Sequence, residues 1–247
     1  MTQRDVEITT PDGVCDATLH TPEGTGPWPA VIMFPDAGGK RPTFHEMAQR
    51  LADLGYAVLL PNVFYRVGEY EPFDMKTVFS DPAERARIMK MVEGLSKEEA
   101  ARDIGAMLDF LAEQPEVAGT AVGVTGYCMG GGLALTAAGR YPDRVRAAAA
   151  FHAGRIATDA HDSPHRLAES MAAKVYVAGA IKDASFDDEQ RDRLLAAFQE
   201  AEVDHTFETY EALHGFAVPD NPTYDEVAAE RHWQAMADLY ASTLGTA

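Results

Sequence analysis

The chain is poor in cysteine and in basic residues, and each shortage excludes a class of protein. Its 247 residues include only two cysteines, Cys15 and Cys128. They are too few for a disulfide scaffold and lack the CxxC spacing of a zinc or thioredoxin-like centre. Lys and Arg number 21 against 39 Asp and Glu, so the formal charge is −18 and the pI is near 4.7. Such a surface repels phosphate backbones and anionic lipid, and we expect neither a nucleic-acid nor a membrane partner.

Long apolar runs and internal repeats are also missing. No stretch reaches the roughly 18 consecutive apolar residues of a membrane span. Arg4, Asp5 and Glu7 stand where a secretory signal would need an apolar core. We therefore expect a cytoplasmic globular protein that needs no cofactor to fold, since 46% of the residues are hydrophobic and 24% are charged.

Short apolar runs alternate with amphipathic segments along the chain. The runs mostly lack polar alternation, which is typical of strands covered on both faces. The predicted strands are Ala30–Phe34, Tyr56–Leu60, Ala121–Thr125, Val145–Phe151, Lys174–Ala178 and His205–Tyr210. The predicted helices are Phe44–Leu54, Lys97–Leu111, Asp187–Ala201 and Tyr224–Leu244. This alternation predicts an α/β fold with a doubly wound, mostly parallel sheet and helices on both faces.

Two segments depart from the alternation. Val6–Thr10 and Val14–His20 flank a Pro-Asp-Gly turn and predict an N-terminal antiparallel hairpin. Residues 63–95 are long and mixed in character, so we interpret them as an insertion bordering an active site within a single domain, 1–247. Its aromatic side chains either line a pocket or pack the segment down. They are Phe64, Tyr65, Tyr70, Phe73 and Phe79.

The most informative stretch is Gly126-Tyr127-Cys128-Met129-Gly130, between a predicted strand and a helix-forming run. It is the G-x-S-x-G nucleophile-elbow pattern with cysteine in the serine position. A thiol at such a turn faces the N-terminus of the next helix, which favours an anion. Cys128 is therefore the predicted nucleophile, whereas a small buried cysteine is the alternative interpretation. Cys15 lies in an edge strand without this pattern and is predicted to be structural.

A cysteine nucleophile needs a histidine base and an acid that orients it, and in this fold class they follow in the order acid, histidine. Asp183 follows a buried strand and is the predicted acid. Asp187 and Asp188 are alternatives, although Asp187 is better placed to cap a helix. His214 lies in a loop after the last strand and is the predicted base.

None of the other histidines combines the required order with a loop beyond a buried strand. They are His20, His45, His152, His161, His165, His205 and His232. His152 could line the rim of the site or be an ordinary strand-end residue. His161 and His165 lack a clear set of acidic or cysteine partners, so we predict no metal site.

Two backbone N–H groups are needed to hold the oxyanion. Met129, directly after the nucleophile, is predicted to supply one, and Ala37, in the loop after the first parallel strand, the other. Asp36 in the same loop is expected to lie near the thiol.

These residues resemble the dienelactone hydrolase family of α/β-hydrolases, whose elbow reads Gly-x-Cys-x-Gly-Gly and whose triad is Cys, Asp and His in that order. The resemblance spans nearly the whole chain. It implies an α/β-hydrolase fold and hydrolysis of a lactone or carboxylic ester through a thioester, with Cys128, Asp183 and His214 as the triad and no metal or organic cofactor. The partner it implies is a small-molecule substrate, while the oligomeric state is left open.

The chain departs from the family pattern around the substrate. The family has an acid, usually glutamate, that interacts with the resting thiol, and here that residue is Asp36. Family arginines hold a substrate carboxylate, but Val218 stands four residues after the histidine. Arg85 or Arg87 could match a second such arginine, although Met89 replaces the expected tyrosine. The resemblance thus implies Asp36 and Arg85 as substrate-binding residues and a broader ester or lactone specificity.

Two other functions fit the same residues. A thioesterase or acyltransferase would form the same thioester and pass it to another acceptor. A ligand-binding or redox-sensing protein would use Cys128 only as a reactive thiol, and would need neither the acid nor the histidine.

Overall fold

The fold is built on one eight-stranded sheet, which we describe from a computed structural model covering residues 2–245. The strand order is β1-β2-β4-β3-β5-β6-β7-β8. The strands are β1 (Thr2–Thr10), β2 (Gly13–Thr21), β3 (Trp28–Phe34), β4 (Ala57–Pro61), β5 (Val117–Tyr127), β6 (Val145–Phe151), β7 (Lys174–Ala180) and β8 (His205–Tyr210). The β1–β2 hairpin and the β2–β4 pair are antiparallel, and every other pair is parallel. The predicted mostly parallel sheet with an antiparallel hairpin at its edge is confirmed.

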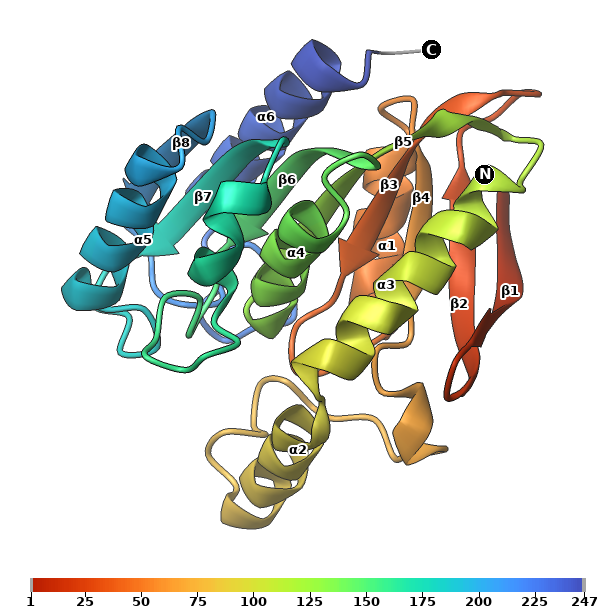
Figure 1. The fold of residues 1–247 in the computed structure, drawn as a ribbon. Coiled ribbons are helices and arrows are strands. Elements are labelled where there is room, and N and C mark those ends of the chain that lie inside the picture. The colour runs from red at the N-terminus through yellow and green to blue at the C-terminus, as the bar shows by residue number, and fades with distance from the viewer. Residues whose placement is uncertain (1, 246–247) are drawn as a thin grey trace.

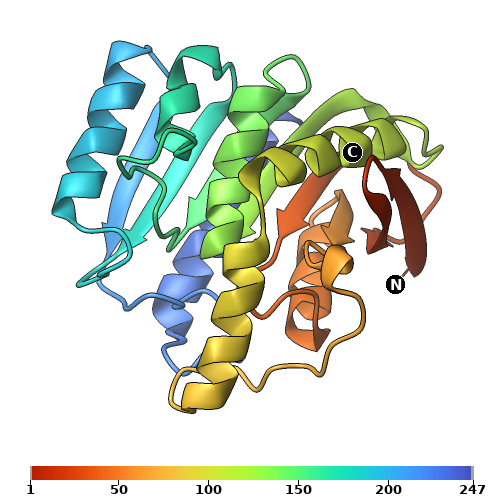
Figure 2. The same cartoon turned by 60° about the horizontal axis from the view of Figure 1, so that its bottom comes forward.

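Helices cover both faces of this sheet, as the alternating pattern predicted (Figures 1 and 2). The helices are α1 (Pro42–Ala52), α2 (Pro82–Gly94), α3 (Lys97–Ala112), α4 (Met129–Arg140), α5 (Asp188–Glu200) and α6 (Glu226–Thr243), with short 3₁₀ turns at Tyr65–Val67 and Pro164–Ser170. One core cluster lies under α1 and α6, and the other under α3, α4 and α5. An apolar layer therefore packs against each face of the sheet, and the parallel strands are buried on both sides.

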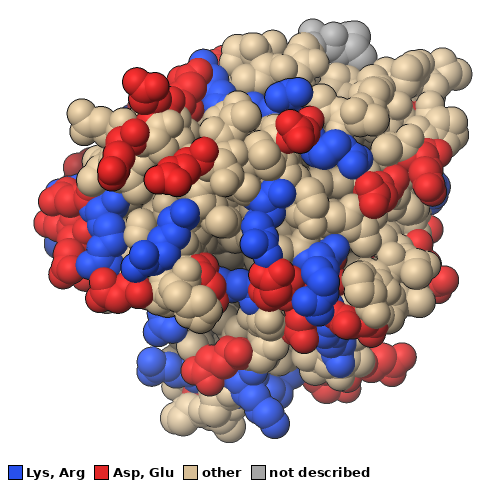
Figure 3. All heavy atoms as spheres, viewed as in Figure 1, with Lys and Arg blue, Asp and Glu red and all other residues tan. Residues whose placement is uncertain are grey.

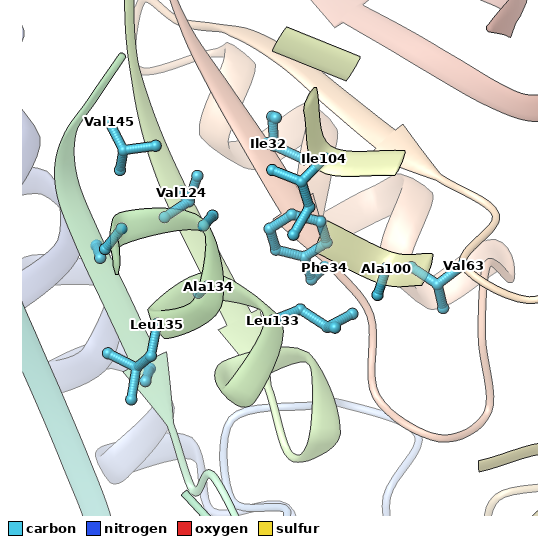
Figure 4. Packing of buried hydrophobic residues seen from close by; sticks show 14 of the residues in the cluster. Ile32, Phe34, Val63, Ala100, Ile104, Val124, Leu133, Ala134, Leu135 and Val145 are labelled. Atoms are coloured by element: carbon cyan, nitrogen blue, oxygen red, sulfur yellow. The ribbon is translucent and has the colours of Figure 1, made fainter. Parts of the chain in front are cut away.

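The core beside α4 fixes the position of that helix on the sheet. Leu133 and Ala134 of α4 belong to the same buried cluster as Phe34 of β3 and Val124 of β5 (Figure 4). Ile104 of α3 belongs to the same cluster. Because β3 and β5 are paired in register, α4 begins at the carboxyl ends of both strands.

Residues 63–95 contain a helix that the sequence pattern did not predict. Helix α2 is capped by Asp81, whose carboxylate accepts the N–H groups of Ala83 and Glu84. Only Ile88 and Met91 of α2 are buried, so its apolar periodicity is weak. The helix projects beyond the carboxyl ends of the parallel strands, on the side where such sheets build their sites (Figure 1).

Among the helices of residues 2–245, none combines the length and the hydropathy that spanning a bilayer requires.

Candidate active site

Cys128 stands at the turn between β5 and α4 in a strained backbone conformation. Its φ is 55° and its ψ is −117°, in a region that non-glycine residues rarely occupy. Its N–H donates to the carbonyl of Phe151, at 3.1 Å, which ties the turn to β6. Strain of this kind costs about 1–3 kcal/mol and is commonly found at functional sites. The half-exposed thiol is thereby presented at the N-terminus of α4.

The glycines around Cys128 are required by close backbone contacts. A Cβ atom at Gly126 would lie 1.9 Å from the carbonyl oxygen of Gly130, and a Cβ atom at Gly130 would lie 2.4 Å from the carbonyl oxygen of Phe34. Both contacts are with backbone atoms and leave no room for a side chain. The turn therefore packs directly against the end of β3, where the loop with Asp36 and Ala37 begins.

His214 and Asp183 meet at the carboxyl ends of β7 and β8. His214 Nδ1 lies 2.7 Å from Asp183 Oδ2, and the Asp183 side chain is only 4% exposed. Gly215, at a φ of 96°, lets the chain turn sharply after His214. Nδ1 is used by the carboxylate, so Nε2 is the ring nitrogen left for Cys128.

The environment of His214 favours its protonated form. Burial by itself would lower the pKa of the imidazole, but hydrogen bonds to Asp183 and to Cys128 outweigh burial and raise the pKa from 6.5 to about 10. A histidine in this setting is an imidazolium at neutral pH. The three residues that the sequence predicted as a unit are thus brought together by four separate elements, β5, α4, β7 and β8.

Ser185 also supports this arrangement, although the sequence analysis did not single it out. Its N–H and its hydroxyl both donate to Asp183 Oδ1, at 2.9 and 2.6 Å. Burial raises the pKa of Asp183, but the hydrogen bonds with His214 and Ser185 more than offset burial and lower it. The spacing Asp-x-Ser is the signal that could have identified it, because a turn of this type places the serine N–H on the aspartate. Asp187, as predicted, caps a helix by accepting the N–H of Gln190.

Two backbone N–H groups beside Cys128 are free to bind a ligand. Within residues 2–245, nothing accepts a hydrogen bond from the N–H of Ala37 or from that of Met129. Met129 is the first residue of α4, where N–H groups have no partner inside the helix. Ala37 follows β3 in a buried turn.

Asp36 is held by a buried arginine. Its two carboxylate oxygens accept hydrogen bonds from Arg41 at 2.6 and 3.0 Å, and Oδ1 also accepts the N–H of Gly38 at 2.9 Å. Arg41 in turn donates two hydrogen bonds to Asp220, at 2.7 and 2.8 Å. The expected role of Asp36 beside the thiol stays a prediction.

Arg41 was not found by sequence reasoning, because its partner Asp220 is 179 residues away. Burial alone would lower the pKa of the Arg41 guanidinium. The carboxylates of Asp220 and Asp36 outweigh burial, so the pKa is raised and Arg41 stays charged. This Asp36–Arg41–Asp220 cluster joins the loop after β3 to the loop that carries His214. Val218, which stands where the family has an arginine, is fully buried.

Arg85 and Arg87, the two candidate substrate-binding arginines of residues 63–95, lie on α2. Arg85 is exposed, and Arg87 donates to Glu84 and to the carbonyl oxygen of Glu71. The proposed contact of Arg85 with substrate stays a prediction.

Most of the aromatic side chains of residues 63–95 pack against the rest of the protein. Phe64 and Phe73 are buried, and Tyr70 lies against Phe73. Tyr65 donates a hydrogen bond to Asp103, and Phe79 is exposed.

His152 lies behind His214 and is buried. Their ring centroids are 5.1 Å apart, and neither ring nitrogen of His152 has a hydrogen-bond partner among the residues described. Burial, together with the charge on His214, lowers the pKa of His152 well below its usual value. The neutral ring of His152 therefore packs against the ring of His214.

Cys15 has a different environment from Cys128. It is fully buried, and burial raises the pKa of its thiol to about 12. Within residues 2–245, no group of three or more His, Cys, Asp or Glu side chains is arranged to hold a metal ion.

Comparison with known proteins identifies the family of this chain. The model of the dienelactone hydrolase family matches residues 15–244. Carboxymethylenebutenolidase of Rhodococcus opacus is 26% identical over 93% of this chain and 88% of its own length. The crystal structure of a dienelactone hydrolase-like promiscuous phosphotriesterase from metagenomic libraries is 30% identical, with a TM-score of 0.80, and covers 98% of both chains.

The fold is shared even where the sequences have diverged further. A candidate dienelactone hydrolase of Klebsiella pneumoniae is 22% identical and has a TM-score of 0.84, covering 97% of this chain and 98% of its own. The family match covers nearly the whole chain. The chain therefore belongs to the dienelactone hydrolase family, a family of α/β hydrolases.

Proposed function

We propose that this protein hydrolyses carboxylic esters or lactones, with Cys128 as nucleophile, His214 as general acid and base, and Asp183 as the residue that orients the imidazole. One observation carries the proposal. The imidazole of His214 interacts both with the thiol of Cys128, on the strained turn, and with the buried carboxylate of Asp183, which lies 2.7 Å from Nδ1. This is the nucleophile, base and orienting-acid arrangement of acyl-transfer enzymes.

In acylation, His214 either keeps Cys128 as a thiolate or takes the proton of its thiol, and the thiolate is the group that attacks. The high pKa of His214 keeps its ring protonated at neutral pH, and the N-terminus of α4 favours the negative sulfur. Sγ of Cys128 attacks the carbonyl carbon, and the carbonyl oxygen becomes an oxyanion. This oxyanion accepts hydrogen bonds from the N–H groups of Ala37 and Met129. When the intermediate collapses, the imidazolium gives its proton to the leaving alkoxide.

Deacylation uses the same groups in the reverse sense. Neutral His214 takes a proton from water, whose oxygen attacks the thioester carbon. The carbon–sulfur bond breaks, the product acid leaves, and the thiolate is again paired with the imidazolium. For a lactone, the alcohol and the acid leave as one molecule.

The test is hydrolysis of a panel of activated esters and unsaturated lactones by the wild type, Cys128→Ala and Cys15→Ala. We expect turnover by the wild type and loss of at least about a thousandfold in kcat/KM for Cys128→Ala. Cys15→Ala is the matched control, because it removes the other thiol, and it should retain turnover.

Other outcomes would point elsewhere. Undiminished turnover by Cys128→Ala would reject the cysteine mechanism. A thioester on Cys128 that is released by added thiols or amines, but not by water, would replace hydrolysis by acyl transfer.

A further inference from the structure

A large groove beside the catalytic residues has no part in the chemistry described above. It has a volume of about 1150 Å³ and runs from the α2–α3 junction across α4 to the loops after β6 and β7. Figure 3 shows a hollow on this face of the molecule, with Lys and Arg side chains around it. Pockets for small organic ligands typically measure about 300–1,000 Å³, so this one is far larger than a single lactone ring requires.

The groove borders the proposed acyl-transfer centre. Met129, whose N–H is free, lines the groove, and so does Ser185, which binds the orienting carboxylate of Asp183. A substrate whose carbonyl carbon lies at Cys128 can therefore extend its acyl group along α4.

The lining exposes more apolar than polar surface, although polar side chains are interspersed in it. Its larger apolar side chains come from three parts of the chain and are Met89, Val92, Leu95, Met129, Leu133 and Leu167. All except Leu133 are only partly buried and pack against the core of the molecule. They keep apolar surface exposed to water, and covering this surface is favourable.

Charged side chains at the rim are mostly neutralised by one another. Lys97 on α3 pairs with Asp162 at 3.2 Å, and Arg140 on α4 pairs with Glu98. Arg166 donates to the carbonyl oxygen of Ala160, which orients the guanidinium without neutralising its charge. Within residues 2–245, Glu93, Arg155 and Arg166 also line the groove and form no ion pair. The unpaired charge is therefore small, two exposed cations against one carboxylate, and of the two cations only Arg155 forms no side-chain hydrogen bond with the described part of the chain.

Gly132 is the one glycine of the elbow region that packing does not explain. A Cβ atom at its neighbour Gly131 would lie 2.5 Å from the Cβ atom of Ala153, which forbids a side chain there. At Gly132 the nearest atoms, from Ile156 and Pro164, would be 3.8 and 3.9 Å away, an ordinary contact distance. Glycine inside a helix is destabilising relative to alanine. Gly132 lines the groove, so the missing side chain keeps the groove open.

We infer that the groove binds the acyl part of a neutral ester or lactone that carries a long aliphatic or multi-ring apolar group, and that Gly132 sets the room available to it. This inference rests on the proposed function and adds the substrate class. The esters preferred by this chain are then much larger than a simple lactone.

The experiment compares kcat/KM for the p-nitrophenyl esters of acetate and octanoate. The wild type should prefer octanoate, and Gly132→Leu should lower the octanoate-to-acetate ratio at least about tenfold, with Gly132→Ala in between. Ala241→Leu is the control, because Ala241 is exposed on α6, which covers the face of the sheet opposite the groove, and its ratio should equal that of the wild type.

Each result decides a separate point. A wild type that hydrolyses acetate with Cys128 but shows no preference for octanoate, or a Gly132→Leu ratio that does not change, overturns the groove inference alone. Absence of turnover on every ester overturns the proposed function and the inference with it.

An anionic acyl group is the remaining alternative, and a third probe tests it. The p-nitrophenyl monoester of octanedioic acid has the same chain length and ends in a carboxylate. We expect it to be a poorer substrate than octanoate. A preference for the diacid monoester that Arg155→Met abolishes would replace the neutral acyl group by an anionic one.

Discussion

At the scale of single residues, the site depends on one carboxylate that sets the charge of one imidazole. Asp183 is buried, receives two hydrogen bonds from Ser185, and binds Nδ1 of His214. A buried carboxylate with this many donors stays ionised and holds the ring in one tautomer. The thiol and the leaving group can then both use Nε2.

Asp183→Asn should reduce activity and move its pH dependence. The carboxylate raises the pKa of His214, so its removal must lower that pKa from the value of about 10. The imidazolium is then lost at lower pH, and the alkaline limb of the kcat/KM profile should shift to lower pH. We expect kcat/KM near neutral pH to fall by about a hundredfold to ten-thousandfold.

The measurement is a full pH profile of kcat/KM for the wild type, Asp183→Asn and Asp187→Asn. Asp187 caps a helix close by and serves as the control, so its variant should keep the wild-type limb. If the limb of Asp183→Asn stayed in place while the rate fell, Asp183 would act on packing rather than on the charge of His214.

At the scale of elements, the site is assembled from the carboxyl ends of β3, β5, β7 and β8. Parallel pairing brings these ends to one edge of the sheet, and the loops that follow carry the chemistry. The Asp36–Arg41–Asp220 cluster joins the first of these loops to the last. It lies between the N–H of Ala37 and the loop of His214, so it maintains the spacing between the two.

Arg41→Met should destabilise the protein strongly. The side chain of Arg41 is 6% exposed, and its removal leaves the carboxylates of Asp36 and Asp220 facing each other without a cation. Breaking a buried ion pair in this way costs about 3–5 kcal/mol, which at about 2–4 °C per kcal/mol lowers the melting temperature by roughly 10 °C.

Thermal unfolding of Arg41→Met, and of Arg41→Met combined with Asp36→Asn and Asp220→Asn, tests this origin. The triple variant carries no uncompensated charge and should recover much of the lost stability. Equal melting temperatures for the single and triple variants would show that the cluster acts through shape rather than charge. Arg50→Met is the control, because its ion pair with Glu230 is exposed and is worth little.

The sequence predicted elements whose signal is local and missed those whose cause is distant. Each parallel strand is marked by its own apolar run, and the turn at Cys128 is marked by the glycines beside it. Both signals are local, so the sheet and the turn could be predicted from the sequence. Helix α2 was missed because only two of its residues are buried. The pairing of Arg41 with Asp220 was missed because the two residues are 179 positions apart and meet only after β3 and β8 have been placed in one sheet.

At the scale of the whole molecule, the dominant electrostatic feature is a formal charge of −18. Repulsion among the excess carboxylates acts over long distances and opposes the compact state. The surface also carries exposed ion pairs with short contacts, such as Arg50 with Glu230 at 2.6 Å and Arg231 with Glu208 at 3.0 Å. Added salt weakens both effects, so its net influence shows which of them is larger.

Salt should raise the melting temperature, because screening acts mainly on the long-range repulsion. Going from 10 to 150 mM NaCl shortens the Debye length from about 30 Å to about 8 Å. Charges farther apart than this stop repelling one another, whereas ion pairs in contact at about 3 Å are much less affected, and each contributes only about 0–1 kcal/mol. We expect a rise of about 2–4 °C, equivalent to about 1 kcal/mol, in a thermal unfolding series with NaCl. Sulfate is avoided because its exclusion from the protein surface stabilises any protein. A fall in melting temperature over this range would mean that the ion pairs outweigh the net charge.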